Sequence, residues 1–564
     1  MKRIYTLFTV IALGLLSVSC SEDLLEIPQK GVITVDNFYQ TDEDAESALV
    51  AMYKQYAEDI MMTEYAAGNY IPWYACFNVC GDDFLAGGSQ YGASPWYGEM
   101  NEFRYDSQNQ IIELTYPRYY RMSYYANLVI DHFKDGTSAT MKRCVAEARV
   151  LRAYCHMMLA IGWGAAPLAD HVLGANECLP NYEGGQKGLL EWCAKECEEA
   201  VANLEERKST ADKDGVVKFT KGAAWTIAGK AYLFAGNYSK AKENLKKVID
   251  SGKYALVPGE RWADNFHQRG DGNEEKILEV NFVNTTAQSR YRLERRSKWQ
   301  QLQSWCWSTG KLASMPVWIG VKSGWGCCAI QEDFAEEFLQ NDGDSYRRKA
   351  TFLTADEFLY EMQWTAETDA MTREEKEVSP LIGIKNTDGL YGNGKYICLK
   401  NMPLREDVDH SSRAFGFTNM LVFRYAEVLL MYAEVAAVDG DSDGLGLKCL
   451  QDIQRRAGAP VSSTLTLDAV KKEKGYEMWL ECCRWPDQIR WGDITDRLRK
   501  QGSNIPSLKD AYFTNNEPKH RLFVTYSNPN GEGYSNFQEK HKLFPYPYSA
   551  MQTNPNLVQN PGWD

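Results

Sequence analysis

The sequence predicts an all-α protein made of tetratricopeptide-like helical hairpins, with a large irregular, loop-rich insertion that presents the ligand-binding residues. Two observations predict this architecture. Residues 224–250 fit the start of the tetratricopeptide consensus without a gap, and segments with helical periodicity occur on both sides of residues 261–420, which are rich in Gly, Pro, Asn and aromatic side chains. A single helical solenoid interrupted by one insertion is the economical explanation of both observations.

The division of the chain follows from these patterns, because no low-complexity stretch or long run of like charge marks a linker in its 564 residues. We expect an export signal in residues 1–19 and an N-terminal part with helical hairpins in residues 20–260. A C-terminal part then spans residues 261–564, with loops over 261–420, helices over 421–500 and an irregular tail.

The N-terminus has the pattern of a lipoprotein export signal. A basic start, "MKR", precedes the apolar run "IYTLFTVIALGLLSV", which is too short for a secure membrane span. The run ends at "LLSVSC", where small residues precede Cys20, although Leu16 lies one position further from the Cys than usual. We expect Cys20 to become the acylated first residue. The alternative is an ordinary cleaved signal that leaves Cys20 as an unmodified thiol.

The net charge argues against nucleic acid as a partner. Removal of residues 1–19 takes away Lys2 and Arg3 but no acidic residue, so the net charge changes from −14 to −16. Proteins that bind nucleic acid need a basic surface, and the same charge disfavours strongly anionic polysaccharides. The acidic residues directly after Cys20, in "SEDLLEIPQ", predict a polar, solvated tether.

The fifteen cysteines raise the question of disulfides in an exported protein. The alternative is free buried thiols that pack as small apolar groups, and we favour it because a chain of this length needs no covalent staples. The seven histidines show no ligand spacing, so we expect neither a metal site nor a cofactor. Several cysteines are adjacent or four residues apart: Cys76 and Cys80, Cys193 and Cys197, Cys327 and Cys328, Cys482 and Cys483.

The clearest helical hairpin is predicted at residues 224–250, "AWTIAGKAYLFAGNYSKAKENLKKVID". Small Ala228 and Ala231 allow two helices to approach closely, and Gly236 in the turn can take a positive φ. The tail of the repeat is degenerate. The consensus positions that match are Trp225, Gly229, Tyr232, Gly236, Tyr238 and Ala241.

Other segments with helical periodicity belong to the same series of helices. They are residues 118–133, 144–163, 189–204, 423–438, 447–458 and 467–493.

Four segments in order along the chain resemble motifs of the SusD/RagB family of lipoproteins. They are "EARVLRAYCHMMLAIGWGAAPL", "FRYAEVLLMYAEVAA", "YEMWLECCRWPDQIRWGD" and "FPYPYSAMQTNPNLVQNPGWD". The third is similar to the family pattern E-x-x-x-E-G-x-R-W, except that Cys482 and Cys483 replace the small pair usual there. With the lipoprotein signal, the resemblance spans nearly the whole chain.

The resemblance implies a cell-surface lipoprotein of the outer membrane, SusD-like in fold, that binds nutrients, mostly glycans, and is not an enzyme. Such proteins work with a SusC-like TonB-dependent transporter, to which the ligand is delivered. Two alternatives stay open. One is a peptide-binding member of the same family, and the other is a surface glycoside hydrolase, although no motif singles out a pair of catalytic carboxylates.

Tryptophans in polar surroundings supply the candidate ligand-binding residues. The stretch "KWQQLQSWCWSTG", residues 298–310, places three of them among Lys, Gln, Ser and Gly. A flat ring can cover the C–H face of a sugar while nearby amides and guanidiniums bind its hydroxyls. The alternative is a Trp-rich loop packed onto the helices, since large aromatics mostly pack. The candidates are Trp299, Trp305 and Trp307, and, from a second cluster, Trp73, Trp96, Tyr97, Asn101 and Arg104.

Two other motifs are incomplete. "GLYGNGKY" has the spacing of a phosphate-binding loop, but Tyr396 stands where Ser or Thr must meet Mg²⁺. "DGDSDG", residues 439–444, begins like a calcium-binding loop, but Leu450 replaces the bidentate Glu. We therefore favour an interhelical turn over a calcium site at this position.

Overall fold

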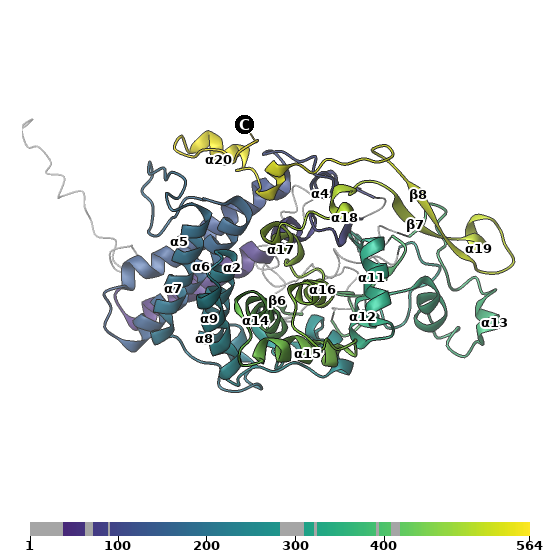
Figure 1. Ribbon diagram of the computed structural model, residues 1–564, viewed down its shortest axis with the longest axis horizontal. Helices are drawn as coiled ribbons and strands as arrows, with labels where there is room; N and C mark the ends of the chain where they lie inside the picture. Colours follow the sequence, from purple (N-terminus) through teal and green to yellow (C-terminus); the bar gives the residue numbers. More distant parts are fainter. Residues whose placement is uncertain are drawn as a thin grey trace, which may run out of the picture.

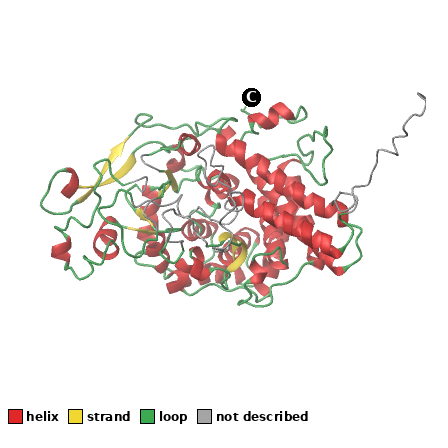
Figure 2. Ribbon diagram, turned by 180° about the vertical axis from the view of Figure 1, so that it is seen from behind, coloured by secondary structure: helices red, strands yellow, loops and turns green. Residues whose placement is uncertain are grey.

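The protein is described here from a computed structural model, which describes residues 38–61, 72–87, 91–282, 310–320, 324–390, 394–407 and 418–563. Helices dominate, and the longer ones lie side by side in one half of the molecule (Figures 1 and 2). This architecture confirms the predicted all-α class. The helices of the first part are α2 (Asp42–Met61), α3 (Pro72–Asn78), α4 (Pro95–Asn101), α5 (Gln110–Phe133), α6 (Ala139–Trp163), α7 (Gly185–Ala200), α8 (Lys221–Phe234) and α9 (Tyr238–Asp250).

The helical series is continuous in space although it is interrupted in sequence. Each helix from α5 to α9 packs against the next one along the chain, and α9 packs directly against α14, from Tyr425 to Asp439. α14 in turn packs against α15 (Leu445–Ala457) and α16 (Leu467–Glu477). Residues 251–424 thus leave the series after α9, and the chain resumes it at α14.

The tetratricopeptide hairpin is present as α8 and α9. At Gly229 the two helices approach so closely that a Cβ atom would lie 2.7 Å from the Leu245 side chain. Gly236 adopts φ +73° in the turn, a backbone conformation that costs glycine little. The Asn237 side chain accepts a hydrogen bond from the Lys240 amide and so caps α9.

The expectation of one helix over residues 467–493 was wrong. The segment forms α16, an irregular stretch over 478–483, and α17 (Arg484–Trp491). Leu480 and Cys482 adopt φ +64° and +61° in that stretch, which ends any helix. Tertiary contacts hold this conformation, because the indole of Trp479 donates to the Asp83 carbonyl over 3.0 Å and the Cys482 amide donates to Asn78 over 2.9 Å.

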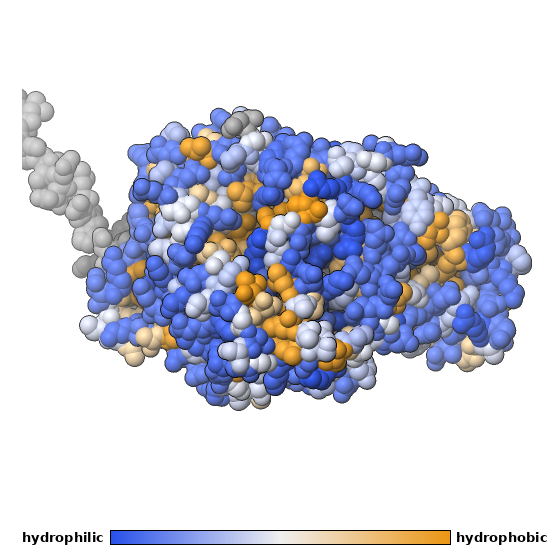
Figure 3. Space-filling view, viewed as in Figure 1, coloured by the Kyte–Doolittle hydropathy of each residue, from blue (hydrophilic) through white to orange (hydrophobic). Residues whose placement is uncertain are grey.

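Within the described ranges the strands form four two-stranded antiparallel sheets, and three of these sheets include a strand from the loop-rich part. β1 (Phe84–Ala86) pairs with β3 (Cys328–Ile330), β2 (Lys276–Val280) with β6 (Met420–Arg424), β4 (Phe352–Leu353) with β5 (Ile397–Cys398), and β7 (Ile505–Asp510) with β8 (Leu522–Ser527). The β2–β6 pair brings the two ends of the loop-rich part together. β7 and β8 lie in a lobe on the right of Figure 1, and Figure 3 shows a hydrophobic patch over them, besides further hydrophobic areas near the centre of the same face.

The remaining helical elements are short and connect these parts. The α-helices are α11 (Glu332–Asp342), α12 (Tyr346–Thr351), α13 (Arg373–Lys376), α18 (Asp496–Arg499), α19 (Ala511–Thr514) and α20 (Tyr548–Thr553). The other helical turns are η3 (Val201–Asn203), η4 (Asp214–Val216), η5 (Gly259–Phe266), η6 (Gln268–Gly270), η8 (Glu357–Met362) and η9 (Glu539–Lys542).

The cysteines within the described residues are free thiols, and all of them except Cys178 are buried, as we expected.

The segment "DGDSDG" forms the turn between α14 and α15, where Asp441 accepts hydrogen bonds from the amides of Gly446 and Leu447 over 2.7 and 2.9 Å. Within the described ranges, no cluster of three or more His, Cys, Asp or Glu side chains is placed to hold a metal ion. No helix in the same ranges combines the length and apolarity needed to cross a bilayer.

Candidate ligand-binding site

Four of the predicted site residues, Cys20, Trp299, Trp305 and Trp307, lie outside the described residues. Trp73 is part of α3, but its side chain is not among those the structure describes. The aromatic platform at residues 299–307 therefore stays a prediction.

The second predicted cluster gathers on one short helix, α4, and the loop that follows it. Proline at the first helical position and the apolar side chains on the inner face explain why "PWYGEMN" forms a helix here. Tyr97 is 2% exposed and belongs to the main core, whereas Trp96 is partly buried against that core. Of these two rings, only Trp96 therefore has a part at the surface.

Asn101 is buried and uses its amide group within the protein. Its nitrogen donates to the carbonyls of Val79 and Phe84 over 2.8 and 3.2 Å, and its oxygen accepts from the Ala86 amide over 3.3 Å. The same oxygen accepts from the Tyr91 hydroxyl over 3.0 Å. Asn101 thus fastens β1 and Tyr91 to the end of α4, which favours a positioning role over direct contact with a ligand.

Arg104 remains half-exposed after α4. Its guanidinium donates to the Glu102 carboxylate over 2.5 Å, and the Glu102 side chain is nearly buried. A charge held in this way can still donate from its free edge, so Arg104 is available to a hydroxyl or carbonyl group of a ligand.

Tyr91, which the sequence analysis did not single out, forms part of the wall of a surface depression of about 340 Å³. Burial raises the pKa of the Tyr91 phenol well above its ordinary value, with the Glu102 carboxylate adding to the effect, so the hydroxyl stays a hydrogen-bond donor. Strands β1, β7 and β8 supply most of the lining. The described residues that line the depression are Leu85, Tyr91, Asp388, Leu390, Gly394, Ile505, Pro506, Ser507, Lys509, Thr525, Tyr526 and Ser527.

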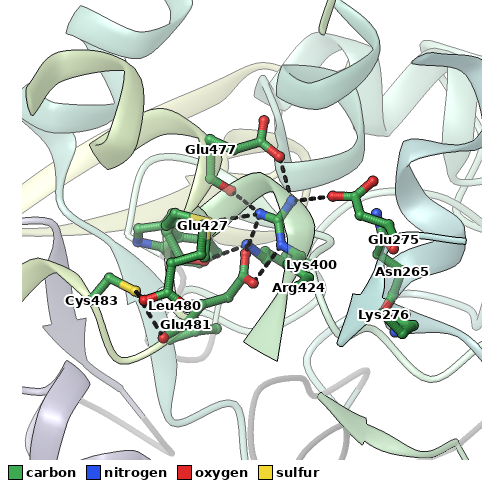
Figure 4. A network of polar contacts seen from close by, with 12 residues as sticks. Asn265, Glu275, Lys276, Lys400, Arg424, Glu427, Glu477, Leu480, Glu481 and Cys483 are labelled. Atoms are coloured by element: carbon green, nitrogen blue, oxygen red, sulfur yellow. Dashed lines mark hydrogen bonds and ion pairs between the residues drawn. The ribbon is translucent and has the colours of Figure 1, made fainter. Parts of the chain in front are cut away.

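Charged residues of two family-like motifs, among them Arg424, Glu477 and Glu481, lie elsewhere, in a buried ionic network (Figure 4). Arg424, at the end of β6, donates to Glu275 over 2.7 Å, to Glu477 over 2.5 Å and to both oxygens of Glu481 over 2.7 Å. Burial alone would raise the pKa of Glu477, but the guanidiniums of Arg456, Arg424 and Arg347 together lower it well below its ordinary value. These carboxylates are therefore fully committed to structural ion pairs.

The network also fixes the loop-rich part to the helices. Lys400 donates to Glu481 over 2.6 Å and to the Trp479 carbonyl over 2.5 Å. The adjacent cavity, lined by side chains that include Arg424 and Asn419, has a free volume of about 40 Å³. Such a volume accommodates a few water molecules. The network thus ties Lys400 of the loop-rich part to the stretch that follows α16.

Comparison with known proteins agrees with the motifs. A model of the SusD family matches residues 308–563, and a model described as starch-binding associating with outer membrane matches residues 40–233. A SusD-like protein of Bacteroides ovatus is 22% identical, covering 98% of this chain and 97% of its own. The starch-binding protein SusD of Bacteroides thetaiotaomicron is 24% identical over 82% of this chain and 81% of its own.

The fold is also found among solved structures. The structure of surface glycan-binding protein A from Bacteroides thetaiotaomicron in complex with laminarihexaose matches with a TM-score of 0.69 and 21% identity. The match covers 92% of this chain and 100% of the other. Two SusD-family models together cover most of the chain, and the fold is shared along nearly its whole length. This chain therefore belongs to the SusD family.

Proposed function

We propose that this protein binds a glycan at the cell surface and passes it, unhydrolysed, to a SusC-like TonB-dependent transporter of the outer membrane. The observation that carries the proposal is the depression beside Tyr91. It is about 340 Å³ in volume, and it combines apolar side chains with the hydroxyls of Ser507, Thr525 and Ser527. A sugar presents the same two kinds of surface, a C–H face and a rim of hydroxyls.

The comparisons support the class of ligand. One relative is named a starch-binding protein, and one similar structure is a complex with laminarihexaose. Binding to such a site is the sum of weak contacts, because each hydrogen bond replaces one to water and contributes only about 0.5–1.5 kcal/mol. Affinity for a repeating polymer then depends on several contacts, and the predicted platform, which includes at least one of Trp299, Trp305 and Trp307 with help from Trp96, would supply some of them.

The anchor and the transporter belong to the same proposal. Acylated Cys20 holds the protein at the outer membrane, because several acyl chains on one residue suffice for stable anchoring. The acidic tether after Cys20 then leaves the binding face in solution. If Cys20 carries the lipid, Cys20→Ala abolishes labelling by a fatty-acid probe and releases the protein from the outer membrane. A Cys20→Ala protein that still labels contradicts the anchor.

The test of the ligand class uses the protein from Ser21 onwards in affinity gels that contain starch, laminarin or other glycans, followed by calorimetry with the retained polymer. We expect retardation by at least one neutral glycan, and recovery of the ligand intact after long incubation. New reducing ends above a heat-killed control would favour the hydrolase. Binding of a peptide library with no binding of any glycan would favour the peptide-binding alternative.

A further inference from the structure

Tyr526, on strand β8, stands between two surface depressions. The first is the depression beside Tyr91, and the second has a volume of about 460 Å³. Leu85, Pro506 and Tyr526 line both of them and so form the ridge between the two, which we call the saddle. Leu85 and Pro506 are apolar and buried, and Tyr526 is 54% exposed, so Tyr526 is the residue of the saddle that presents an accessible ring to solvent.

The ring of Tyr526 is held in place before any ligand arrives. Its hydroxyl donates to the Glu332 carboxylate over 2.9 Å, and Glu332 is itself paired with Lys395 over 3.0 Å. Across the sheet, Pro506 is the residue directly opposite Tyr526, so both side chains project from the same face. An exposed aromatic that is fixed at both ends loses little conformational entropy when a ligand stacks on it.

The lining on both sides of the saddle is polar but balanced in charge. The first depression has one acidic and one basic side chain, Asp388 and Lys509. The second has two acidic and two basic side chains, Glu332 and Asp333 against Arg497 and Lys500. Its remaining polar lining consists of the amides and hydroxyl of Gln331, Gln501, Ser503 and Asn504. A surface of this composition complements an uncharged ligand rich in hydroxyls.

We propose that the two depressions form one groove, and that Tyr526 is the stacking platform at its centre for an internal segment of a linear, neutral polysaccharide. One sugar ring lies over the saddle, and its neighbours on either side enter the two depressions. This inference rests on the proposed glycan-binding function and narrows it to a ligand that must extend past the platform in both directions. Affinity therefore rises with chain length until both depressions are filled.

The test compares Tyr526→Ala with Tyr346→Ala, a matched control, because the Tyr346 side chain is also 54% exposed and lies against Gly259 and Gly458 rather than in the groove. Calorimetry uses maltooligosaccharides and laminarioligosaccharides of increasing length. We expect Tyr526→Ala to weaken binding of the longest oligosaccharides about five- to tenfold, near the low end of stacking on an aromatic ring, and to flatten the dependence on length. Tyr346→Ala changes neither.

Tyr526→Phe separates stacking from general damage to the hairpin. It keeps the ring and loses only the bond to Glu332, so it should retain more affinity than Tyr526→Ala at an unchanged melting temperature. If the wild-type protein binds oligosaccharides and Tyr526→Ala binds them as Tyr346→Ala does, the platform is overturned while glycan binding stands. If the wild-type protein binds no glycan, the proposed glycan-binding function and the platform both fail. Binding of peptides but not of glycans would likewise contradict both proposals.

Discussion

Trp96 is, among the tryptophans of the predicted platform, the one whose side chain the structure describes. Because it is partly buried against the core, it can contribute both to packing and to ligand contact. We predict that Trp96→Ala weakens glycan binding by about 1–3 kcal/mol, the range for stacking on an aromatic ring. Calorimetry gives the affinity, and thermal unfolding gives the cost in stability.

The control for this experiment must be a tryptophan with a purely structural role. The place of Trp225 in the tetratricopeptide hairpin predicts a buried side chain, but Trp225 is only partly buried. It is therefore a weak control for a structural tryptophan. Trp479 is fully buried, and Trp479→Ala should cost about 3–5 kcal/mol of stability while sparing the affinity per folded molecule. If Trp96→Ala and the variants of Trp299, Trp305 and Trp307 all behave in that way, the platform is wrong.

His156 predicts a dependence of stability on pH. Its Nδ1 donates to the Arg152 carbonyl and its Nε2 accepts from the Ala169 amide, each over 3.0 Å, so the bonded ring is neutral. Burial lowers the pKa of His156 to about 4. The unfolded chain, with a histidine pKa of about 6.5, binds a proton first as the pH falls. The stability from neutral His156 is thus fully present above pH 6.5 and is lost progressively as the pH falls toward about 4.

The measurement is urea unfolding at several pH values between 7 and 4, for the wild-type protein and for His156→Gln. The loss attributable to His156 over this range is on the order of 3 kcal/mol. We expect a shallower slope in His156→Gln. His541, whose pKa burial also lowers to about 4, contributes equally to both proteins and does not affect the comparison. Equal slopes would contradict the assignment.

The sequence predicts the residues of the second cluster as ligand contacts, but it cannot predict how far each side chain is buried. Asn101 and Arg104 are both polar and three residues apart, yet one is enclosed by β1 and Tyr91 and the other is half-exposed. That difference depends on segments distant along the chain, which no local pattern records. No local pattern singles out Tyr526, our proposed platform, for the same reason, since its place beside Leu85 depends on how β8 is positioned against β1.

At the scale of elements, the stretch between α16 and α17 differs from the family pattern at position 482, and the effect of this difference on stability can be tested. That pattern has glycine at position 482, where this chain has cysteine with φ +61°. A left-handed backbone costs a non-glycine residue about 1–2 kcal/mol. We predict that Cys482→Gly is more stable than Cys482→Ala by up to about 1 kcal/mol, because both lose the thiol but only glycine relieves the strain.

The neighbouring cysteine supplies the control, because Cys483 adopts φ −102°. There the order should reverse, with Cys483→Gly less stable than Cys483→Ala by about 0.5–1 kcal/mol. Denaturant unfolding of the four variants decides the matter. The same order at both positions would mean that the backbone conformation does not govern the effect.

The helices were predictable where the information is local. The hairpin of α8 and α9 follows from its own small residues and turn glycine, and the structure has it where the repeat pattern placed it. The single helix expected over 467–493 failed because Trp479 and Cys482 bond to Asp83 and Asn78, about four hundred residues earlier in the chain. Periodicity cannot detect a partner at that separation.

At the scale of the whole molecule, the second part of the helical series and the loop-rich part meet at the Arg424 network. Arg424, Glu477 and Glu275 come from β6, α16 and the residue before β2, and their side chains are fully buried. Residues of two motifs that carry the family resemblance therefore join helices to the loop-rich part, and the proposed ligand-binding residues lie outside this network. This division explains why a sequence can indicate the family clearly and the ligand poorly.

The network yields a prediction for the whole fold. Arg424→Met replaces the guanidinium by an uncharged side chain of similar length. Glu481, Glu477 and Glu275 are then left with one fewer cationic partner in the protein interior. Removing one member of a buried ion pair costs about 3–5 kcal/mol, mainly because the remaining charges lose their compensation. We expect that loss in the free energy of unfolding from urea denaturation. The exposed pair of Arg521 and Glu517 is the control, and Arg521→Met should leave the free energy of unfolding nearly unchanged, because solvent screens an exposed ion pair.

A second variant distinguishes charge from packing in the same network. Glu481→Gln keeps the shape of the side chain but removes the charge that faces Arg424 and Lys400. If unpaired charge dominates, Arg424→Met combined with Glu481→Gln should be less destabilised than the sum of the two single changes, because each relieves the imbalance that the other creates. Two results would show that the network is not what joins the helices to the loop-rich part. One is that the losses in the free energy of unfolding of the two single variants simply add up in the double variant. The other is that Arg424→Met costs no more stability than Arg521→Met.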